Sequence, residues 1–419
     1  MSAPSTPPSE MPRLKDSRFK HTGTSCERAD SYRPGGFHPV HLQDVLNSRY
    51  RVIRKLGYGS FATVWLAVDS IHAANVDVSK ELSIQHHLSA NSKDSCSNFV
   101  LLLLDSFIFE GPNGRHYCFV TEPMGPSVSA VLGAPLEFYD PVNPSSHRFP
   151  TLQTRNFLRN ILTGLGFIHG NHIVHSDLHS GNLLFSLKGL TALNPQELEQ
   201  NETNSKLDPL LRIDGKVDRW APKYLAVPKP LVEEAFLMLL LTQAYIKAFW
   251  INNPPESIVT PLTLRAPETI FHCGVGPAID IWSFGCLIFE LLTDYPLFEV
   301  FTFRRQKDAI DDDHLIQLSE IIGLLPKDMR VQWSRSSLYF GPDGERLATC
   351  PSSFDKSSDP GSPMPFPSLE DKFHEYKPAD INDAEVKEIV SPLRDILQID
   401  PRNRPSASQL LKQPWFRVE

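Results

Sequence analysis

The chain has 419 residues and 41% hydrophobic content, enough for one large bilobal domain or two ordinary domains. A formal net charge of -8 argues against direct binding to nucleic acid and suits basic protein partners. The six cysteines show no metal-ligand spacing, which predicts free thiols in a reducing compartment, the cytoplasm or the nucleus.

The first predicted elements are a tail and a hairpin. Residues 1–36 are rich in Pro, Ser and charge and carry few large apolar groups, which predicts a disordered tail. We expect order to begin at residue 37. Residues 49–68 then alternate between apolar and polar around a glycine-containing turn, the pattern of two antiparallel strands.

Strands give way to helices about a third of the way along the chain. Two further strands are predicted over residues 99–104 and 116–122, joined by the turn residues 111–114. From Leu152 the apolar residues recur with helical spacing, and Gly170 ends the pattern.

The remainder of the chain alternates polar segments with helices. Residues 186–232 are polar and irregular and are predicted to form an insert, and residues 340–380 are predicted to form a surface excursion. Apolar helices are predicted over residues 278–293 and 386–396. The segment Ser406–Gln409 is a capping-box pattern that opens a last helix.

A strand-rich first part followed by a helix-rich second part indicates an α+β fold of two lobes with a cleft between them. We expect a small N-lobe over residues 37–122 and a larger helical C-lobe over residues 125–419.

One apolar run, residues 235–251, has some of the character of a membrane segment. It is shorter than the roughly 20 residues that a spanning helix needs, and Gln243 and Lys247 interrupt it. A buried strand or helix is the prediction, and no membrane partner is expected.

The segment from His175 to Asn182, HSDLHSGN, carries the strongest chemical signal. Asp177 is followed five residues later by Asn182, between an amphipathic helix and an apolar strand. This is the catalytic-loop pattern of a phosphotransferase, in which the Asp accepts a hydroxyl proton and the Asn holds a metal ion. The alternative is an ordinary turn, because Asp and Asn both favour turns.

The predicted hairpin holds a second, weaker signal. Gly57 and Gly59 lie between two strands, where glycine lets the backbone close over phosphate oxygens. Many hairpins contain two glycines, and Ala62 stands where the third glycine of the pattern would fall.

Three later motifs strengthen the functional interpretation of the loop and the hairpin. They are Ala266-Pro267-Glu268, Asp280-Ile281-Trp282-Ser283-Phe284-Gly285 and Asp400-Pro401-Arg402-Asn403-Arg404-Pro405. Their order and spacing resemble the eukaryotic protein kinases, over most of the chain from Tyr50 to Phe416. The segments YRPGGFHPVHLQDVLNSRYRVIRKLGYGSFATVWLA and LLDSFIFEGPNGRHYCFVTEPMGPSV resemble the SR-protein kinase branch, of the fungal type. The resemblance implies ATP and Mg²⁺ as cofactors, Arg/Ser-rich splicing-type proteins as substrates, and a monomer.

The resemblance also assigns roles by position. It implies Asp177 as the catalytic base, Asn182 as a magnesium ligand and His175 as a structural histidine, with His179 at a position that is often Lys. A neutral His179 would stabilise charge less well at the transferring phosphoryl group. The implied nucleotide-binding positions are Leu56, Gly57, Gly59, Phe61, Val64, Glu81, Thr121, Glu122 and Met124. Glu268 and Arg404 match a buried ion pair, and Asp280 matches the residue that braces the catalytic loop.

Two parts of such an active site are not found. The one Lys between Leu66 and Glu81 is Lys80, and neighbours on one helix cannot form the required Lys–Glu pair. Ala244 falls where a metal-binding Asp belongs, and Ala cannot ligate magnesium.

Two explanations remain open. The chain is a pseudokinase that acts as a scaffold or binding module, or its coding sequence lacks a segment near residue 70 and is altered near residue 240. A remote alternative is a small-molecule phosphotransferase, because HSDLHSGN also resembles the loop of aminoglycoside-type kinases.

Overall fold

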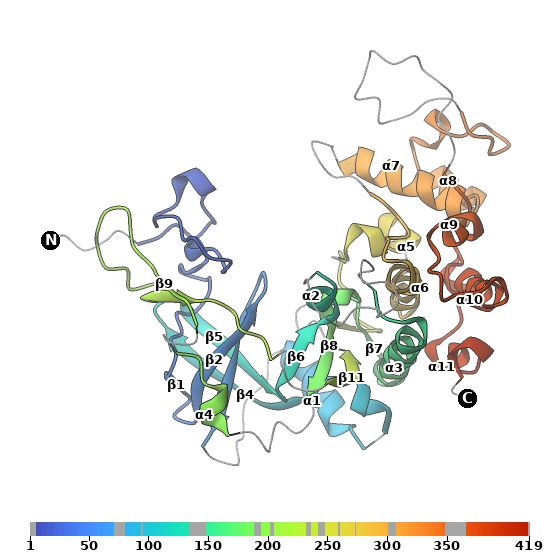
Figure 1. Cartoon of the computed structure of the whole chain (residues 1–419). Helices are drawn as coiled ribbons and strands as arrows, with labels where there is room; N and C mark the ends of the chain where they lie inside the picture. Colours follow the sequence, from blue (N-terminus) through green and yellow to red (C-terminus); the bar gives the residue numbers. More distant parts are fainter. Residues whose placement is uncertain are drawn as a thin grey trace. The chain divides into compact units, whose positions relative to one another are not determined.

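The computed structural model in Figure 1 describes most of the chain. The described residues are 6–70, 80–93, 95–133, 148–187, 194–201, 205–231, 236–241, 248–258, 260–272, 274–300, 307–347 and 366–417. Among these residues, no helix is long and apolar enough to cross a membrane.

The chain divides into two compact units, each described by itself below. Unit 1 comprises residues 1–79, 102–126 and 185–237, and unit 2 comprises the remainder. This division differs from the predicted lobes. The insert groups with the strand-rich unit, and residues 80–101 group with the helical unit.

Strands β1 to β5 of unit 1 form two antiparallel sheets (Figure 1). The first has the order β1-β2-β3 and the second pairs β4 with β5. Their bounds are Val45–Leu46 for β1, Tyr50–Tyr58 for β2, Thr63–Asp69 for β3, Leu103–Gly111 for β4 and Gly114–Thr121 for β5. The two predicted hairpins are therefore confirmed, although β4 begins at Leu103 because Ser95–Phe99 form a 3-10 helix.

No strand joins these two sheets within the described residues between β3 and β4. The chain there forms helix α1, Lys80–Ala90, and the short 3-10 helix, while residues 71–79 lie outside the described part. The expected truncation of the third strand concerns this stretch and lies outside the described residues. The fold remains α+β, with a strand-rich unit and a helical unit.

The predicted tail is wrong for residues 6–36, and the insert is more regular than predicted. The segment contains the 3-10 helices Leu14–Asp16 and Ala29–Ser31, and Tyr32 is buried with Phe19, Ala221 and Leu225. The insert contains α4 at Pro195–Leu198 and a hairpin of β9, Leu207–Pro209, with β10, Tyr224–Ala226. Composition failed because the two segments are joined by a few scattered apolar side chains and by the ion pair of Arg18 with Asp218, not by a continuous apolar run.

Unit 2 is organised around two long helices. Helix α3, Thr151–Gly170, and helix α6, Ala278–Thr293, match the predicted bounds, and α6 is buried along almost its whole length. The remaining helices are α2 at Val128–Leu132, α5 at Pro267–Ile270, α7 at Lys307–Gln317, α8 at Lys327–Gln332, α9 at Leu369–Tyr376, α10 at Asp383–Ile396 and α11 at Ala407–Leu410. The predicted capping box at Ser406 is confirmed, and Asn382 forms a second one on α10.

The apolar run forms strands where it is described. Residues Phe236–Leu241 are β11, in a sheet of order β11-β8-β6 with β8 at Leu183–Leu187 and β6 at Met124–Ser127. Residues Phe249–Trp250 are β12, which pairs with β7, Ile173–Val174. The described part of the predicted excursion contains α9.

Candidate active site

The predicted catalytic loop follows β7 directly and is held by a buried carboxylate on α6. Asp280 is 1% exposed and accepts hydrogen bonds from the backbone amides of His175, at 2.8 Å, and Ser176, at 2.7 Å. The third contact is with His169 Nε2 at 2.8 Å. Charge-assisted hydrogen bonds of this kind are among the strong ones, so Asp280 fixes where the loop begins.

The loop adopts a left-handed backbone conformation one residue before Asp177. Ser176 has a φ of 60°, which is uncommon for a residue other than glycine. Thr260 Oγ1 donates to the Ser176 carbonyl at 3.1 Å, so contacts on both sides of this peptide hold it. Strain held in this way is typical of positions where a side chain must be aimed.

Asp177 and Asn182, five residues apart, meet in space. Asn182 Nδ2 donates to the Asp177 carbonyl at 2.8 Å and to Asp177 Oδ2 at 3.1 Å. The Asp177 amide in turn donates to Nδ1 of His175 at 3.2 Å. His175 is fully buried and accepts at Nδ1, which is the arrangement of a structural histidine rather than a proton carrier.

His179 lies beside Asp177, with Nε2 at 3.7 Å from Oδ2. Its Nδ1 accepts from the Gly181 amide at 3.1 Å, so a proton on this ring belongs on Nε2, facing the carboxylate. A side chain at Gly181 would meet the ring at 2.8 Å, which explains glycine there. The ring is therefore held between the Gly181 amide and the carboxylate of Asp177.

Glu290 is a neighbour of the loop that the sequence did not single out. Ser180 Oγ donates to its Oε1 at 3.3 Å, and burial on α6 raises the pKa of Glu290, opposed by the Ser180 hydrogen bond and by His179. The sequence gives no sign of this role, because Glu290 lies in an apolar helix and belongs to none of the recognised motifs.

The glycine-rich hairpin belongs to unit 1 and has an open tip. Gly57 pairs with Val64, and the Gly59 amide donates to the Ala62 carbonyl at 2.8 Å. A Cβ on Gly57 or Gly59 would meet nothing within 4 Å, and Phe61 is 66% exposed. Exposed backbone beside exposed apolar side chains fits contact with a nucleotide.

The remaining predicted nucleotide positions are spread over other elements. Leu56 is half-buried on β2, while Thr121 ends β5 and donates to the Glu122 carbonyl at 3.2 Å. Glu122 is exposed, and Met124 is buried at the start of β6. The exposed Val64 lies opposite Gly57 on the hairpin.

The described residues do not complete a magnesium site. Lys80 and Glu81 both lie in α1, and Ala244 lies outside the described part of the chain. No group of three or more His, Cys, Asp or Glu side chains in the described residues could hold a metal ion. Asn182 is the one implied ligand in place, so no chemical step through a metal follows from these residues.

The predicted buried ion pair is confirmed. Arg404 donates from both terminal nitrogens to Glu268, at 2.6 and 2.8 Å, and the two side chains are 0% and 1% exposed. The guanidinium lies 4.8 Å from the centroid of the Trp282 ring on α6. These contacts join three separate motifs of the sequence in one structural cluster.

The geometry of the loop and this cluster define a protein-kinase fold. The protein kinase domain family model matches residues 247–416, which include the ion pair and α6. The chain is 28% identical to the serine/threonine-protein kinase SRPK of Physarum polycephalum, over 76% of this chain and 77% of the relative. It is 27% identical to a serine/threonine protein kinase of Aspergillus fumigatus, over 93% and 90%, and 24% identical to protein kinase dsk1 of Schizosaccharomyces pombe, over 94% and 85%.

A solved crystal structure of a kinase domain shares the fold, with a TM-score of 0.54 at 22% identity, covering 90% of this chain and 98% of that one. The chain is thus similar over most of its length to serine/threonine protein kinases of the SR-protein kinase type, and its residues 247–416 match the protein kinase domain.

Proposed function

We propose that the protein transfers the γ-phosphate of ATP to serine in Arg/Ser-rich protein substrates. The observation that carries the proposal is the loop around Asp177, in which Asp280, Thr260 and Asn182 all hold the catalytic position. The resemblance to SR-protein kinases and the net charge of -8 support a basic protein substrate.

In this proposal each described residue has a physical task. ATP with Mg²⁺ supplies the phosphoryl group and neutralises its charge when bound. Asp177 accepts the proton of the substrate hydroxyl, and Asn182 orients that carboxylate through its Nδ2 contact. The open backbone at Gly57 and Gly59 would hold phosphate oxygens. Most of the rate would come from positioning and electrostatic stabilisation.

The test is an assay with ATP, magnesium and an Arg-Ser repeat peptide. Phosphate transfer by the chain that is lost in Asp177→Ala supports the proposal. A peptide in which every Arg is replaced by Ala is the control for substrate class. Transfer no greater than in Asp177→Ala would rule out activity for this chain.

A second candidate function is a pseudokinase scaffold or binding module. The observation that favours it is the position of Lys80 and Glu81 side by side in α1, with no strand between β3 and β4 in the described residues. Thermal unfolding separates the two functions. An active kinase is expected to be stabilised by ATP with magnesium more than by ADP without metal, whereas a scaffold lacking the metal site shows no such difference.

We also propose that the protein is a monomer that works in the cytoplasm or the nucleus, with no membrane and no direct nucleic-acid partner. Cys26, Cys96, Cys118 and Cys286 are free thiols, which suits a reducing compartment. Sedimentation of the purified chain and imaging of a fluorescent fusion test these two points. A stable dimer or a secreted fusion would contradict them.

A further inference from the structure

Lys55 is a fully buried cation on β2, two residues before Gly57. Its Nζ lies 2.7 and 2.5 Å from the two carboxylate oxygens of Glu27. The ring centroids of Tyr58 and Trp65 lie 5.8 and 5.5 Å from the same nitrogen. An ammonium group is costly to bury without a partner charge, so Glu27 is what makes this position tenable.

Glu27 comes from the N-terminal segment and is itself fixed in place. It is 4% exposed and accepts a hydrogen bond from the Tyr32 hydroxyl at 2.5 Å. Tyr32 is buried with Phe19 and Leu225, which belong to the N-terminal segment and the insert respectively. The Glu27 carboxylate is therefore held in place by Tyr32 and its packing, independently of Lys55.

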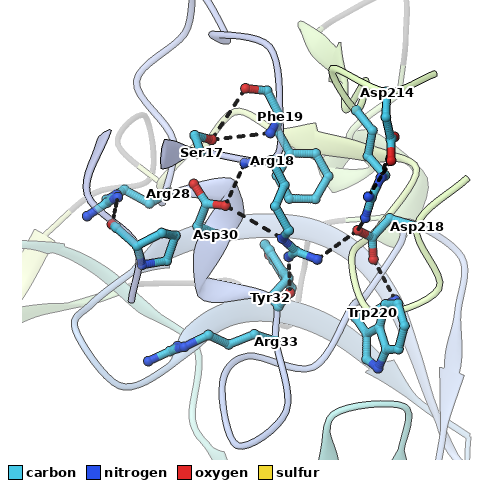
Figure 2. A network of polar contacts seen from close by, with 12 residues as sticks. Ser17, Arg18, Phe19, Arg28, Asp30, Tyr32, Arg33, Asp214, Asp218 and Trp220 are labelled. Carbon is cyan, nitrogen blue, oxygen red and sulfur yellow. Dashed lines mark hydrogen bonds and ion pairs between the residues drawn. The ribbon is translucent and has the colours of Figure 1, made fainter. Parts of the chain in front are cut away.

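We name residues 17–32 the N-terminal strap. Figure 2 shows how Arg18 of the strap lies between Asp30 and Asp218, with its guanidinium 2.9 Å from Asp218. Arg212 contacts the same Asp218 at 2.8 Å, so one carboxylate of the insert joins two cations. A backbone bridge between Phe19 and Arg212 adds a hydrogen-bonded connection. The strap and the insert are thus one ordered body.

The insert also holds the backbone of Lys55. The Lys55 amide donates to Gln200 Oε1 at 2.8 Å, and its carbonyl accepts from the Lys229 amide at 2.9 Å. Gln200 in turn donates to Ser205 Oγ and to the Val227 carbonyl, both at 2.7 Å. Side chain and backbone of one residue of β2 are therefore fixed by segments outside the sheet.

Beyond Lys55 the hairpin is held by its own strand pairing, Gly57 with Val64 and Tyr58 with Thr63. Its tip is exposed at Tyr58, Phe61 and Val64, and neither Gly57 nor Gly59 has atoms packed over it. Trp65 is paired directly with Lys55 across the two strands, so the two rings near the ammonium lie on both arms of the hairpin. A shift of the cation would move both arms.

We propose that Glu27 is a positioning residue for the nucleotide: through Lys55, the strap sets the conformation of the glycine-rich hairpin, residues 56–64. The link between strap and hairpin stands on the contacts above, and its effect on nucleotide rests on the proposed function. The strap is accordingly a part of the nucleotide-binding apparatus rather than a tail.

The test compares Glu27→Gln with Thr24→Val in the full chain. Thr24 Oγ1 donates to Asp208 Oδ2 at 2.6 Å, so its loss weakens the attachment of the strap to the insert without removing the partner of Lys55. Amide hydrogen exchange over residues 56–64 and the affinity for a fluorescent ATP analogue are measured where both variants remain folded. Glu27→Gln is expected to raise exchange and weaken affinity, each about tenfold, and Thr24→Val to change neither.

Glu27→Asp keeps the charge at a shorter reach and is expected to fall between the wild type and Glu27→Gln in both measurements. If Glu27→Gln does not fold, Glu27→Met combined with Lys55→Met removes both charges and leaves an apolar pair that is expected to fold. Wild-type exchange over residues 56–64 in the folded Glu27 variants would overturn the proposal. A wild-type chain that binds no nucleotide would instead refute the proposed function, and the exchange measurement would still decide whether the strap controls the hairpin.

Discussion

Replacing Glu268 by Ala should be among the most damaging single substitutions in the helical unit. Arg404 donates two hydrogen bonds to this carboxylate, and the two side chains are almost wholly buried. The guanidinium also donates to the carbonyls of Ala278, Gln398 and Ile399. The substitution leaves these contacts but removes the charge that balances the cation.

The size of the effect follows from leaving a charge buried without its partner. Breaking a buried ion pair in this way costs about 3–5 kcal/mol, far more than the pair itself is worth against an apolar replacement. A protein domain is stable by only about 5–15 kcal/mol, so the substitution should remove a large part of the stability. Water cannot replace the carboxylate easily, because both side chains are almost wholly buried.

The assay is unfolding by urea, followed by tryptophan fluorescence and by circular dichroism. The matched control is Arg402→Ala, which breaks an ion pair with Asp400 only two residues from Arg404. The Arg402 side chain is 87% exposed, so its loss should cost at most about 1 kcal/mol. If Glu268→Ala loses no more stability than Arg402→Ala, the buried ion pair of Glu268 with Arg404 is not important for the stability of the helical unit.

Three further predictions follow from single contacts. Asp280→Asn should weaken the hydrogen bonds from the His175 and Ser176 amides by about 2–3 kcal/mol in total, which raises hydrogen exchange at these amides. Unchanged protection of these amides would contradict the bracing role of Asp280. Gly285→Ala should destabilise by about 1–3 kcal/mol, because its Cβ would lie 2.5 Å from Ile396, whereas Gly166→Ala, with 4.0 Å of clearance, should be neutral or stabilising in thermal unfolding. Burial lowers the pKa of His38 to about 4, so the native state binds fewer protons than the unfolded chain and stability should fall from pH 6.5 towards 4; an equal pH slope in His38→Gln would contradict this.

The sequence predicts well where a motif is local. The predicted catalytic loop is recognised from eight consecutive residues, and within it Asn182 contacts Asp177. The bounds of α3 and α6 also follow directly, because apolar periodicity and a Gly or αL residue mark their ends. The pair of Glu268 and Arg404 is separated by 136 positions and was predicted through the kinase resemblance alone.

The sequence predicts poorly where order arises from long-range polar contacts. Nothing near Arg18 indicates that Asp218, 200 residues later, would bind it. The same holds for Glu27 and Lys55. In the sequence Glu27 is one charge in a polar tail and Lys55 is one charge in a strand, and nothing indicates that they pair. Composition does not reveal such networks. The cost of burying their charged groups is offset by hydrogen bonds and ion pairs to residues that are distant in the sequence.

Phosphate transfer from ATP to an Arg-Ser repeat peptide, measured in parallel for the full chain and Asp177→Ala, tests the kinase proposal most directly. The proposal predicts transfer to serine by the full chain and none above background in the variant. Transfer that is equal in the two proteins, or absent from both while the chain is folded, would contradict it.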